Sequence, residues 1–359
     1  MVTDEMIKKL PKVELHDHLD GGLRPSTIIE LAKEYNIELP ADNPKELADW
    51  FHRGADRKSL SLYLEGFGVA LSVLQTREAL KRAAREAIED LASENVVYTE
   101  IRFAPVLNIN NGLNLESVVE SVLEGLEEGK KKTGVEYGLI LCAMRDQKVS
   151  LETAELAVSF RDRGVVGFDL AGDEYGHPPK KHLDAFEYIR RKNFNITIHA
   201  GEAFGMESIW QAVQICGAHR IGHATRLVED MVVHGTRIEK MGSLSNFIRD
   251  KRIPLEICLS SNIQTGAAKS FDEHPFNIYF RNHFRVSLGT DNRLMSNTTL
   301  SKEYKIAVKY FNLNLRDIEK LTINAMKSAF IHYDERIRII YDILKPAFAR
   351  LREETNPLV

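Results

Sequence analysis

Eight short apolar runs, separated by longer amphipathic segments, recur along the 359-residue chain and constrain its fold more than any other feature. Each run has the length and β-branched content of a strand, whereas most of the segments between them show helical spacing. Strands that alternate with helices form parallel sheets with crossover helices, and eight such units predict a (β/α)8 barrel, which is an α/β fold. The runs span residues 12–19, 96–103, 136–144, 165–172, 196–202, 220–225, 254–261 and 285–291.

The spacing of the runs also predicts the domain organisation. The length fits one large barrel or two smaller domains, but no linker or internal repeat divides the chain, so we expect a single domain over residues 1–359. Residues 20 to 95, between the first two runs, carry several helical patterns, and we expect this insertion to cover one mouth of the barrel as a lid. An amphipathic segment at about 333–354 predicts a closing C-terminal helix.

Charge and cysteine content exclude several classes of partner. A net charge of -4 gives no basic surface for nucleic acid or an anionic membrane. No apolar stretch approaches the roughly 20 residues of a membrane-spanning helix, and the first residues do not resemble a signal peptide. The three cysteines (Cys142, Cys216 and Cys258) form no C-x-x-C pair, which indicates a reducing, cytoplasmic location.

Reactive side chains stand at the ends of the runs, where a barrel would gather them at one mouth. The stretch "VELHDHLDGG" places His16 and His18 on one face of a strand and Asp17 on the other. On its own, an H-x-H pattern more often marks solvated or core histidines. His199 and Asp291 complete a set of three imidazoles and a carboxylate, which suits a catalytic Zn²⁺, although iron or manganese accepts the same ligands.

Other ionisable groups in the runs suit proton transfer or support of the ligands. His223 could take a proton from a metal-bound water, and a core histidine bonded to a carbonyl is an equally good interpretation. Glu202 could donate a proton to a substrate atom, although a carboxylate at a helix N-terminus is a common alternative. Acids inside apolar runs need partners, so we expect ligand histidines or buried cations beside Asp169, Glu256 and Glu100, the last paired with Arg102.

Six motifs resemble the adenosine deaminases, in the same order along the chain. They are "VELHDHLDGGLRPSTI", "GFDLAGDE", "IHAGE", "RIGHATRLVED", "CLSSNIQTGA" and "SLGTDNRLMSNTTLS", and the resemblance runs from about residue 11 to 330. That family has a (β/α)8 barrel with one zinc ion and hydrolytically removes the 6-amino group of adenosine, giving inosine and ammonia. The resemblance therefore implies a zinc-dependent hydrolase of purine metabolism that acts on adenosine and 2′-deoxyadenosine.

Carried over residue by residue, the resemblance implies four zinc ligands, which are His16, His18, His199 and Asp291. Glu202 would protonate purine N1, while His223, assisted by Asp291, would orient and deprotonate the water on zinc. Asp20 would hold the ribose 5′-hydroxyl, and Gly172 would offer its backbone N–H to purine N3. The implied substrate contacts are thus His18, Asp20, Gly172 and Asn292.

Three positions depart from the family pattern. Asn292 stands where some members carry an aspartate proposed to contact purine N7, and an amide can donate to N7 directly. Ala224 follows His223 where glycine is frequent, and we expect this change to be tolerated. Asp17 lies between two ligand histidines and receives no role.

The inserted segment "SLSLYLEGFGVAL" resembles the hydrophobic gate of this family. Its apolar residues Leu60, Tyr63, Leu64 and Phe67 have helical spacing, which also fits an ordinary buried helix face. Closure of such a gate would exclude water from the reacting centre.

Several alternative functions stay open at this point. Within the family, the rival substrates are free adenine and larger 6-aminopurine nucleosides such as aminodeoxyfutalosine, whereas AMP is disfavoured because no basic cluster flanks the motifs. Another single-metal amidohydrolase, or a non-catalytic binding protein, would share the fold. Nucleic-acid base deaminases are excluded because their C-x-x-C signature is missing. The sequence makes no prediction of oligomeric state.

Overall fold

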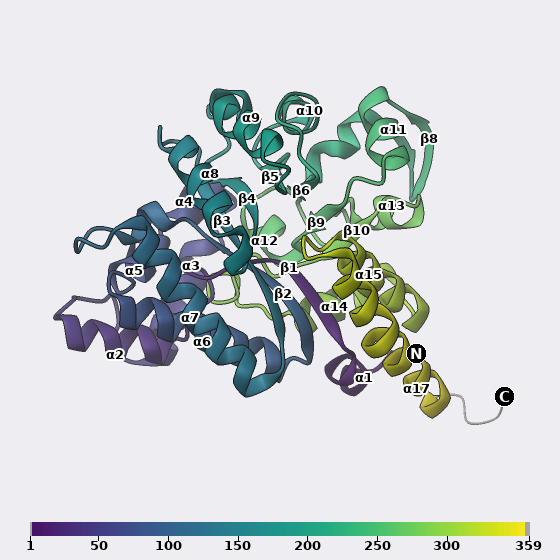
Figure 1. Cartoon of the computed structure of the whole chain (residues 1–359). Coiled ribbons are helices and arrows are strands. Elements are labelled where there is room, and N and C mark those ends of the chain that lie inside the picture. Colours follow the sequence, from purple (N-terminus) through teal and green to yellow (C-terminus); the bar gives the residue numbers. More distant parts are fainter. Residues whose placement is uncertain (1, 356–359) are drawn as a thin grey trace.

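Eight parallel strands close into a barrel in the computed structural model, which describes residues 2–355 (Figure 1). One sheet has the order β1-β2-β3-β4 and the other the order β10-β9-β6-β5. Isolated parallel bridges, Phe168 with Ile196 and Asp17 with Asp291, join the two sheets at both seams. The strands are β1 Lys12–His18, β2 Val96–Phe103, β3 Glu136–Met144, β4 Val165–Ala171, β5 Thr197–Ala200, β6 Arg220–His223, β9 Leu255–Ile257 and β10 Val286–Leu288.

All eight predicted strands are confirmed, although the last four runs extend two to four residues past the end of the strand, and one element was missed. The run at 254–261 stays extended only to Ile257, and its end is the helix α12 Leu259–Gln264. The missed element is an antiparallel hairpin of β7 Met231–His234 and β8 Arg237–Met241, outside the barrel. The residues of β7 alternate between half-buried and exposed, as in a surface strand. This alternation extends over only the few residues of β7, which is too short to predict a strand.

Helices surround the barrel, and local sequence sets their ends. In α7 Leu115–Thr133, for example, the Asn114 side chain caps the first turn and Gly134, at a φ of 80°, ends the last. The other surrounding helices are α8 Ser150–Ser159, α9 Leu183–Arg191, α10 Met206–Trp210, α11 Ser243–Asp250, α13 Phe276–Arg281, α14 Leu300–Phe311 and α15 Leu315–Ser328.

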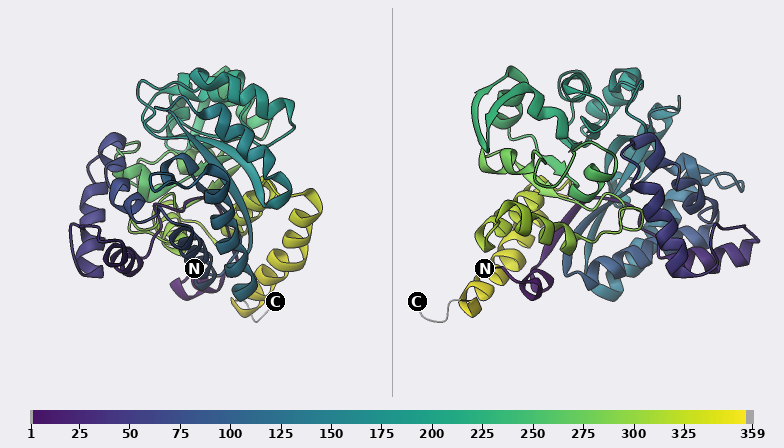
Figure 2. Two further views of the ribbon diagram at one scale, coloured as in Figure 1. Left: turned by 60° about the vertical axis from the view of Figure 1, so that its left-hand side comes forward. Right: turned by 180° about the vertical axis from the view of Figure 1, so that it is seen from behind.

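The predicted insertion between the first two strands is present and covers the C-terminal mouth of the barrel. Its helices are α2 Pro25–Tyr35, α3 Pro44–Ala55, α4 Leu60–Leu64, α5 Phe67–Ser72 and α6 Arg77–Ser93. Figure 2 shows the insertion gathered on one side of the barrel, and α6 lies beside α7 in the outer layer. The Tyr63 hydroxyl lies 2.8 Å from Ser296 Oγ, and Ser61 donates to Asp173. The lid therefore contacts loops that follow β4 and β10.

The predicted gate face is only partly helical. Leu60 and Tyr63 are buried, whereas Leu64 and Phe67 are half-buried. The helix breaks after Leu64 and restarts at Phe67, so these residues do not form one continuous helical face.

The C-terminal segment is helical, as predicted, but interrupted. It consists of α16 Tyr333–Arg338, a π-helical stretch Ile339–Leu344 and α17 Lys345–Thr355. Pro346 has no backbone N–H to donate, and a π-turn before it accommodates that loss. A short helix, α1 Asp4–Lys9, precedes β1. No helix in residues 2–355 has the length and apolar content to cross a membrane. The single domain over 1–359 stays a prediction.

The barrel interior is charged rather than purely apolar. Arg102 contacts Asp169 at 3.0 Å and Glu256 at 2.9 Å, and all three side chains are fully buried. Glu100 pairs with Arg220 at 2.6 Å, so the predicted Glu100–Arg102 pair is wrong. Residues two apart in a strand point the same way side by side, and each of these two side chains finds its partner on another strand.

Candidate active site

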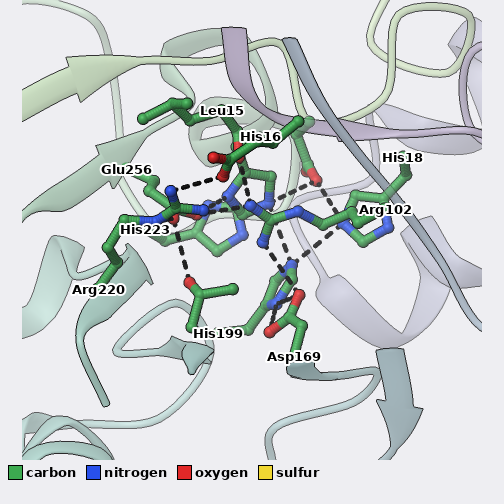
Figure 3. Close-up of polar contacts among 12 residues, drawn as sticks. Leu15, His16, His18, Arg102, Asp169, His199, Arg220, His223 and Glu256 are labelled. Carbon is green, nitrogen blue, oxygen red and sulfur yellow. Dashed lines mark hydrogen bonds and ion pairs between the residues drawn. The ribbon is translucent and has the colours of Figure 1, made fainter. Parts of the chain in front are cut away.

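Four donor atoms from strand ends converge at the C-terminal mouth of the barrel. His16 and His18 lie on β1 and His199 lies on β5 (Figure 3). Asp291 follows β10. Nε2 of His199 lies 3.1 Å from Nε2 of both His16 and His18, and Asp291 Oδ1 lies 3.3 Å from the same two nitrogens. Ligands arranged tetrahedrally about 2.0–2.1 Å from a zinc ion are about 3.3 Å apart. The predicted ligand set therefore fits one metal ion.

The hydrogen bonds behind these histidines also favour a cation. His16 Nδ1 lies 2.8 Å from Glu256 Oε2, and His199 Nδ1 lies 3.1 Å from Asp169 Oδ2. Carboxylates accept hydrogen bonds, so both Nδ1 atoms carry a proton, and the two Nε2 atoms, 3.1 Å apart, are left to bind a cation. Asp169 and Glu256 thus contact His199 and His16, and their support of metal ligands stays a prediction.

A looser group contains His223 in place of His18. The donor atoms of His16, His199, His223 and Asp291 all lie within 4.8 Å of one another. However, Nδ1 of His223 is engaged by the amide of Asn262, and its Nε2 lies 3.5 Å from Glu202 Oε2. The shorter distances to His18 make it the better candidate ligand, and His223 lies beside the candidate metal site.

A chain of three hydrogen bonds determines the tautomer of His223. The backbone N–H of Phe276 donates to Nδ1 of His274 at 3.0 Å, and burial lowers the pKa of His274 to about 3. Neutral His274 then donates from Nε2 to Asn262 Oδ1 at 3.2 Å, which leaves the Asn262 amide nitrogen to donate to His223 Nδ1 at 3.0 Å. Burial also lowers the pKa of His223 well below its usual value. Neutral His223 therefore presents an N–H from Nε2 to the site.

The buried His274 should make folding stability fall in acid. Its pKa is about 3 in the folded chain and about 6.5 when unfolded, so the unfolded chain binds an extra proton between these values. The free energy of unfolding is therefore unaffected by protonation of His274 above pH 6.5 and decreases as the pH falls, by about 2 kcal/mol at pH 5. Urea unfolding of the wild type should therefore give a smaller free energy of unfolding at pH 5 than at pH 7. In His274→Gln this difference between the two pH values should be smaller by about 2 kcal/mol. His234→Gln, on an exposed side chain, should behave as wild type; equal pH dependence in both variants would contradict the assignment.

The backbone at the site is strained. His223, Ala224 and Asp291 have φ angles of 66°, 53° and 61°, a left-handed region that residues other than glycine rarely adopt. Glycine would adopt the angle at Ala224 without strain. Alanine is accommodated there at a cost of about 1 kcal/mol. Holding His223 and Asp291 in this region turns their side chains toward the ligand cluster.

Glu202 lies at the edge of the cluster, on a loop held by a second glutamate. The Glu202 side chain is buried, its Oε1 has no hydrogen-bond partner among the described residues, and burial with nearby Asp291 raises its pKa well above the usual value. The carboxylate of Glu174 accepts four successive backbone N–H groups at 2.7–3.0 Å, those of Gly201, Glu202, Ala203 and Phe204. Such a nest fixes the backbone that carries Glu202.

The predicted substrate contacts also line this end of the barrel. Asp20 and Asn292 are buried, and Asp20 Oδ1 and Asn292 Oδ1 lack hydrogen-bond partners in residues 2–355. Burial raises the pKa of Asp20 to about 7. Gly172 follows β4 with a φ of 98°, and an added Cβ would lie 3.1 Å from Met144 Cε. Buried polar atoms of this kind suit a polar ligand.

Sequence reasoning missed several supporting residues. Glu174 and Asn262 lie inside the quoted motifs "GFDLAGDE" and "CLSSNIQTGA", but nothing in one sequence shows what they contact. Ser261 donates to Asp291 Oδ2 at 2.6 Å. Asp17, which received no role, pairs with Arg293 at 2.9 Å and ties β1 to the loop after β10. That pair was detectable in principle, because a buried acid on the outer strand face needs a cation.

The fold and the donor set define a class of protein, the metal-dependent (β/α)8-barrel deaminases. A model of the family "Adenosine deaminase" matches residues 11–346. The chain is 52% identical to adenosine deaminase 1 of Streptomyces coelicolor over 358 residues, covering 98% of this chain and 90% of that protein. It is 52% identical to an adenosine deaminase of a Mycobacterium species over 356 residues, covering 98% of each chain. The chain belongs to the adenosine deaminase family, which confirms the predicted family, fold and enzyme class.

Solved structures agree with this assignment. The structure of Arabidopsis ADAL complexed with IMP has a TM-score of 0.83 and 30% identity, covering 96% of this chain and 99% of that one. Adenine deaminase from Arthrobacter aurescens has a TM-score of 0.85 at 23% identity, covering 96% of this chain and 99% of that one. At that identity, the second likeness supports the fold alone.

Proposed function

We propose that this chain converts adenosine, and 2′-deoxyadenosine, with water into inosine or deoxyinosine and ammonia, as part of purine salvage. The observation that carries the proposal is the tight donor set of His16, His18, His199 and Asp291 beside buried Glu202, whose Oε1 has no hydrogen-bond partner among the described residues. The sequence relatives named adenosine deaminases, at 52% identity over nearly the full length, support the same reaction.

The proposed ion is one Zn²⁺ per chain, and four N and O ligands at these spacings suit it. When bound, zinc acts as a Lewis acid and lowers the pKa of a coordinated water to about 7. Glu202 gives its proton to purine N1, so that negative charge does not accumulate on the ring as oxygen adds at C6. His223 orients the attacking water by donating from Nε2. The predicted proton transfer from this water to His223 requires the other tautomer, so we assign acceptance of that proton to Asp291. Asp291 then passes it to the amino nitrogen as ammonia leaves, and the remaining hydroxyl proton returns to Glu202.

The mouth of the site favours a nucleoside over a nucleotide. Asp20 is the group proposed to hold the ribose 5′-hydroxyl, and its carboxylate would repel a 5′-phosphate in that position. Adenine and aminodeoxyfutalosine stay as alternative substrates, because both lack that phosphate.

Replacing Asp20 should separate sugar binding from chemistry. Asp20→Ala is expected to raise KM for adenosine about tenfold. With a pKa of about 7 the Asp20 carboxyl is partly charged at neutral pH, and a hydrogen bond to such a group contributes about 1.5 kcal/mol. Deamination of a ribose-lacking substrate should change much less. Steady-state kinetics with adenosine and adenine measure both effects, and an equal change for the two would contradict the sugar contact.

The proposed reaction is tested by ultraviolet spectra of the purified chain with adenosine, 2′-deoxyadenosine, adenine and AMP in separate cuvettes, with bound metal quantified. A shift to the inosine spectrum with the nucleosides, on a protein holding one zinc, is the expected result. Activity on adenine alone would keep the chemistry and overturn the nucleoside assignment. No reaction with any of the four would direct the search to larger aminopurine nucleosides.

The cellular context stays a prediction. The three cysteines are free and buried, which fits the expected cytoplasmic location but also fits other compartments. The expected partner molecule is a purine nucleoside, with no nucleic acid or membrane.

A further inference from the structure

A second cavity lies at the opposite end of the barrel from the candidate active site. It has a volume of about 530 Å³ and lies where β6, β9 and β10 begin. Its lining contains no aspartate or glutamate among the described residues but six cationic side chains, which are Arg220, Lys251, Arg252, Arg285, Lys327 and Arg336. In a chain with a net charge of -4, this concentration of positive charge is unusual.

Five of these cations have no carboxylate partner. Within residues 2–355, no ion pair shorter than 4.0 Å involves Lys251, Arg252, Arg285, Lys327 or Arg336. Arg336 donates to the carbonyl of Lys327 at 3.1 Å, and Arg252 donates to the carbonyl of His283. These contacts hold the guanidinium groups in place without neutralising them.

The cations are close enough to repel one another. Burial lowers the pKa of Arg285 below its usual value, and the nearby charges of Arg252 and Arg336 lower it further. Nε of Arg285 and Nε of Arg336 are buried without a hydrogen-bond partner among the described residues. Nη2 of Arg220, a residue that is only 1% exposed, also has none. A bound anion would neutralise these positive charges and accept hydrogen bonds from the unpartnered N–H groups.

We propose that this cavity binds a small anion carrying two or more phosphate groups. Guanidinium groups bind phosphate oxygens in bidentate fashion, and several cations around one cavity suit several negative charges. A volume of about 530 Å³ exceeds what one phosphate fills and lies in the range of small-molecule pockets. Phe247, which is 37% exposed, adds an aromatic surface at the cavity.

The shared chemistry is a diphosphate group, and two sources of it are distinguishable. Inorganic diphosphate would use the cations alone. A nucleoside diphosphate would add stacking of its base on Phe247 and bind more tightly.

The test is calorimetric titration of the metal-loaded protein with inorganic diphosphate at low salt, with metal content measured before and after because diphosphate chelates zinc. Saturable binding is expected, weakened about tenfold or more by Arg285→Gln. Arg237→Gln, an exposed arginine outside the cavity, is the matched control and should bind as wild type. If Arg285→Gln does not fold, exposed Lys327→Gln replaces it. No binding at millimolar diphosphate, or equal binding by the cavity variants and the control, would overturn the proposal.

Uridine diphosphate in the same titration identifies the source. Tighter binding than inorganic diphosphate, with the gain lost in Phe247→Ala, would assign a nucleotide. Equal affinity would assign the inorganic anion. Both results support the anion site, and neither depends on deamination at the other end of the barrel.

Discussion

The Glu202→Gln variant is expected to keep its metal and lose turnover by about 10²–10⁴-fold, the usual contribution of a positioned general acid. The substitution preserves shape and leaves the four ligands unchanged, but an amide has no acidic proton to give to the purine. Because Glu174 binds the backbone and not the side chain at position 202, the loop should keep its conformation. Initial rates of adenosine deamination and metal content per chain measure the two effects.

A control variant and the metal content together show whether the loss of turnover is specific to the Glu202 side chain. Glu207→Gln alters an exposed glutamate shortly after the same loop and should leave the rate unchanged. Loss of metal together with activity in Glu202→Gln would indicate a structural role. Activity within a few fold of wild type would overturn the proton-donor assignment.

The second large effect is expected from His199→Ala, which should lose its metal and, with it, nearly all activity. The change removes one of the four proposed ligands and leaves buried Asp169 facing a cavity in place of an imidazole. Removing one partner of a buried charged contact costs about 3–5 kcal/mol, so the melting temperature should fall as well. Metal content after dialysis, and thermal unfolding with and without added zinc, measure both consequences.

The same experiment separates the two groups of donors. His18→Ala should lose metal like His199→Ala, whereas His223→Ala should retain it and lose only turnover. His234→Ala, on an exposed hairpin, controls for the loss of a histidine. Full metal occupancy in His18→Ala, with loss in His223→Ala, would show that the looser group is the true ligand set.

The barrel was predictable because its signals are local. Each strand is a short apolar run, and burial of both faces of a parallel sheet makes such runs easy to recognise. The errors also have local causes. Residues 259–261 continue an apolar run but begin α12, and the hairpin β7–β8 is too short and exposed to give a strong pattern.

The site was only partly predictable. The reactive residues follow from local sequence patterns, whereas the residues that hold them in position come from distant parts of the chain. Strand alternation and residue type pointed to His16 and His18, and convergence at one mouth pointed to His199 and Asp291. In contrast, Glu174 acts on a loop 27–30 residues away, and the partner of Glu100 is Arg220 on another strand. One sequence does not show which of several buried charges will meet across a barrel.

Closure of the barrel at the β1–β10 seam has a consequence for synthesis of the chain. The His18 N–H donates to the Asp291 carbonyl, and the Asp291 N–H donates to the His16 carbonyl, both at 2.7 Å. Asp17 and Arg293, paired across this seam, are 276 positions apart. At about 5–20 residues per second, a ribosome needs about 15–55 s to make that interval. The first two proposed ligands, His16 and His18, therefore emerge from the ribosome long before Asp291, and a chain that ends before residue 291 lacks one of the four proposed donors.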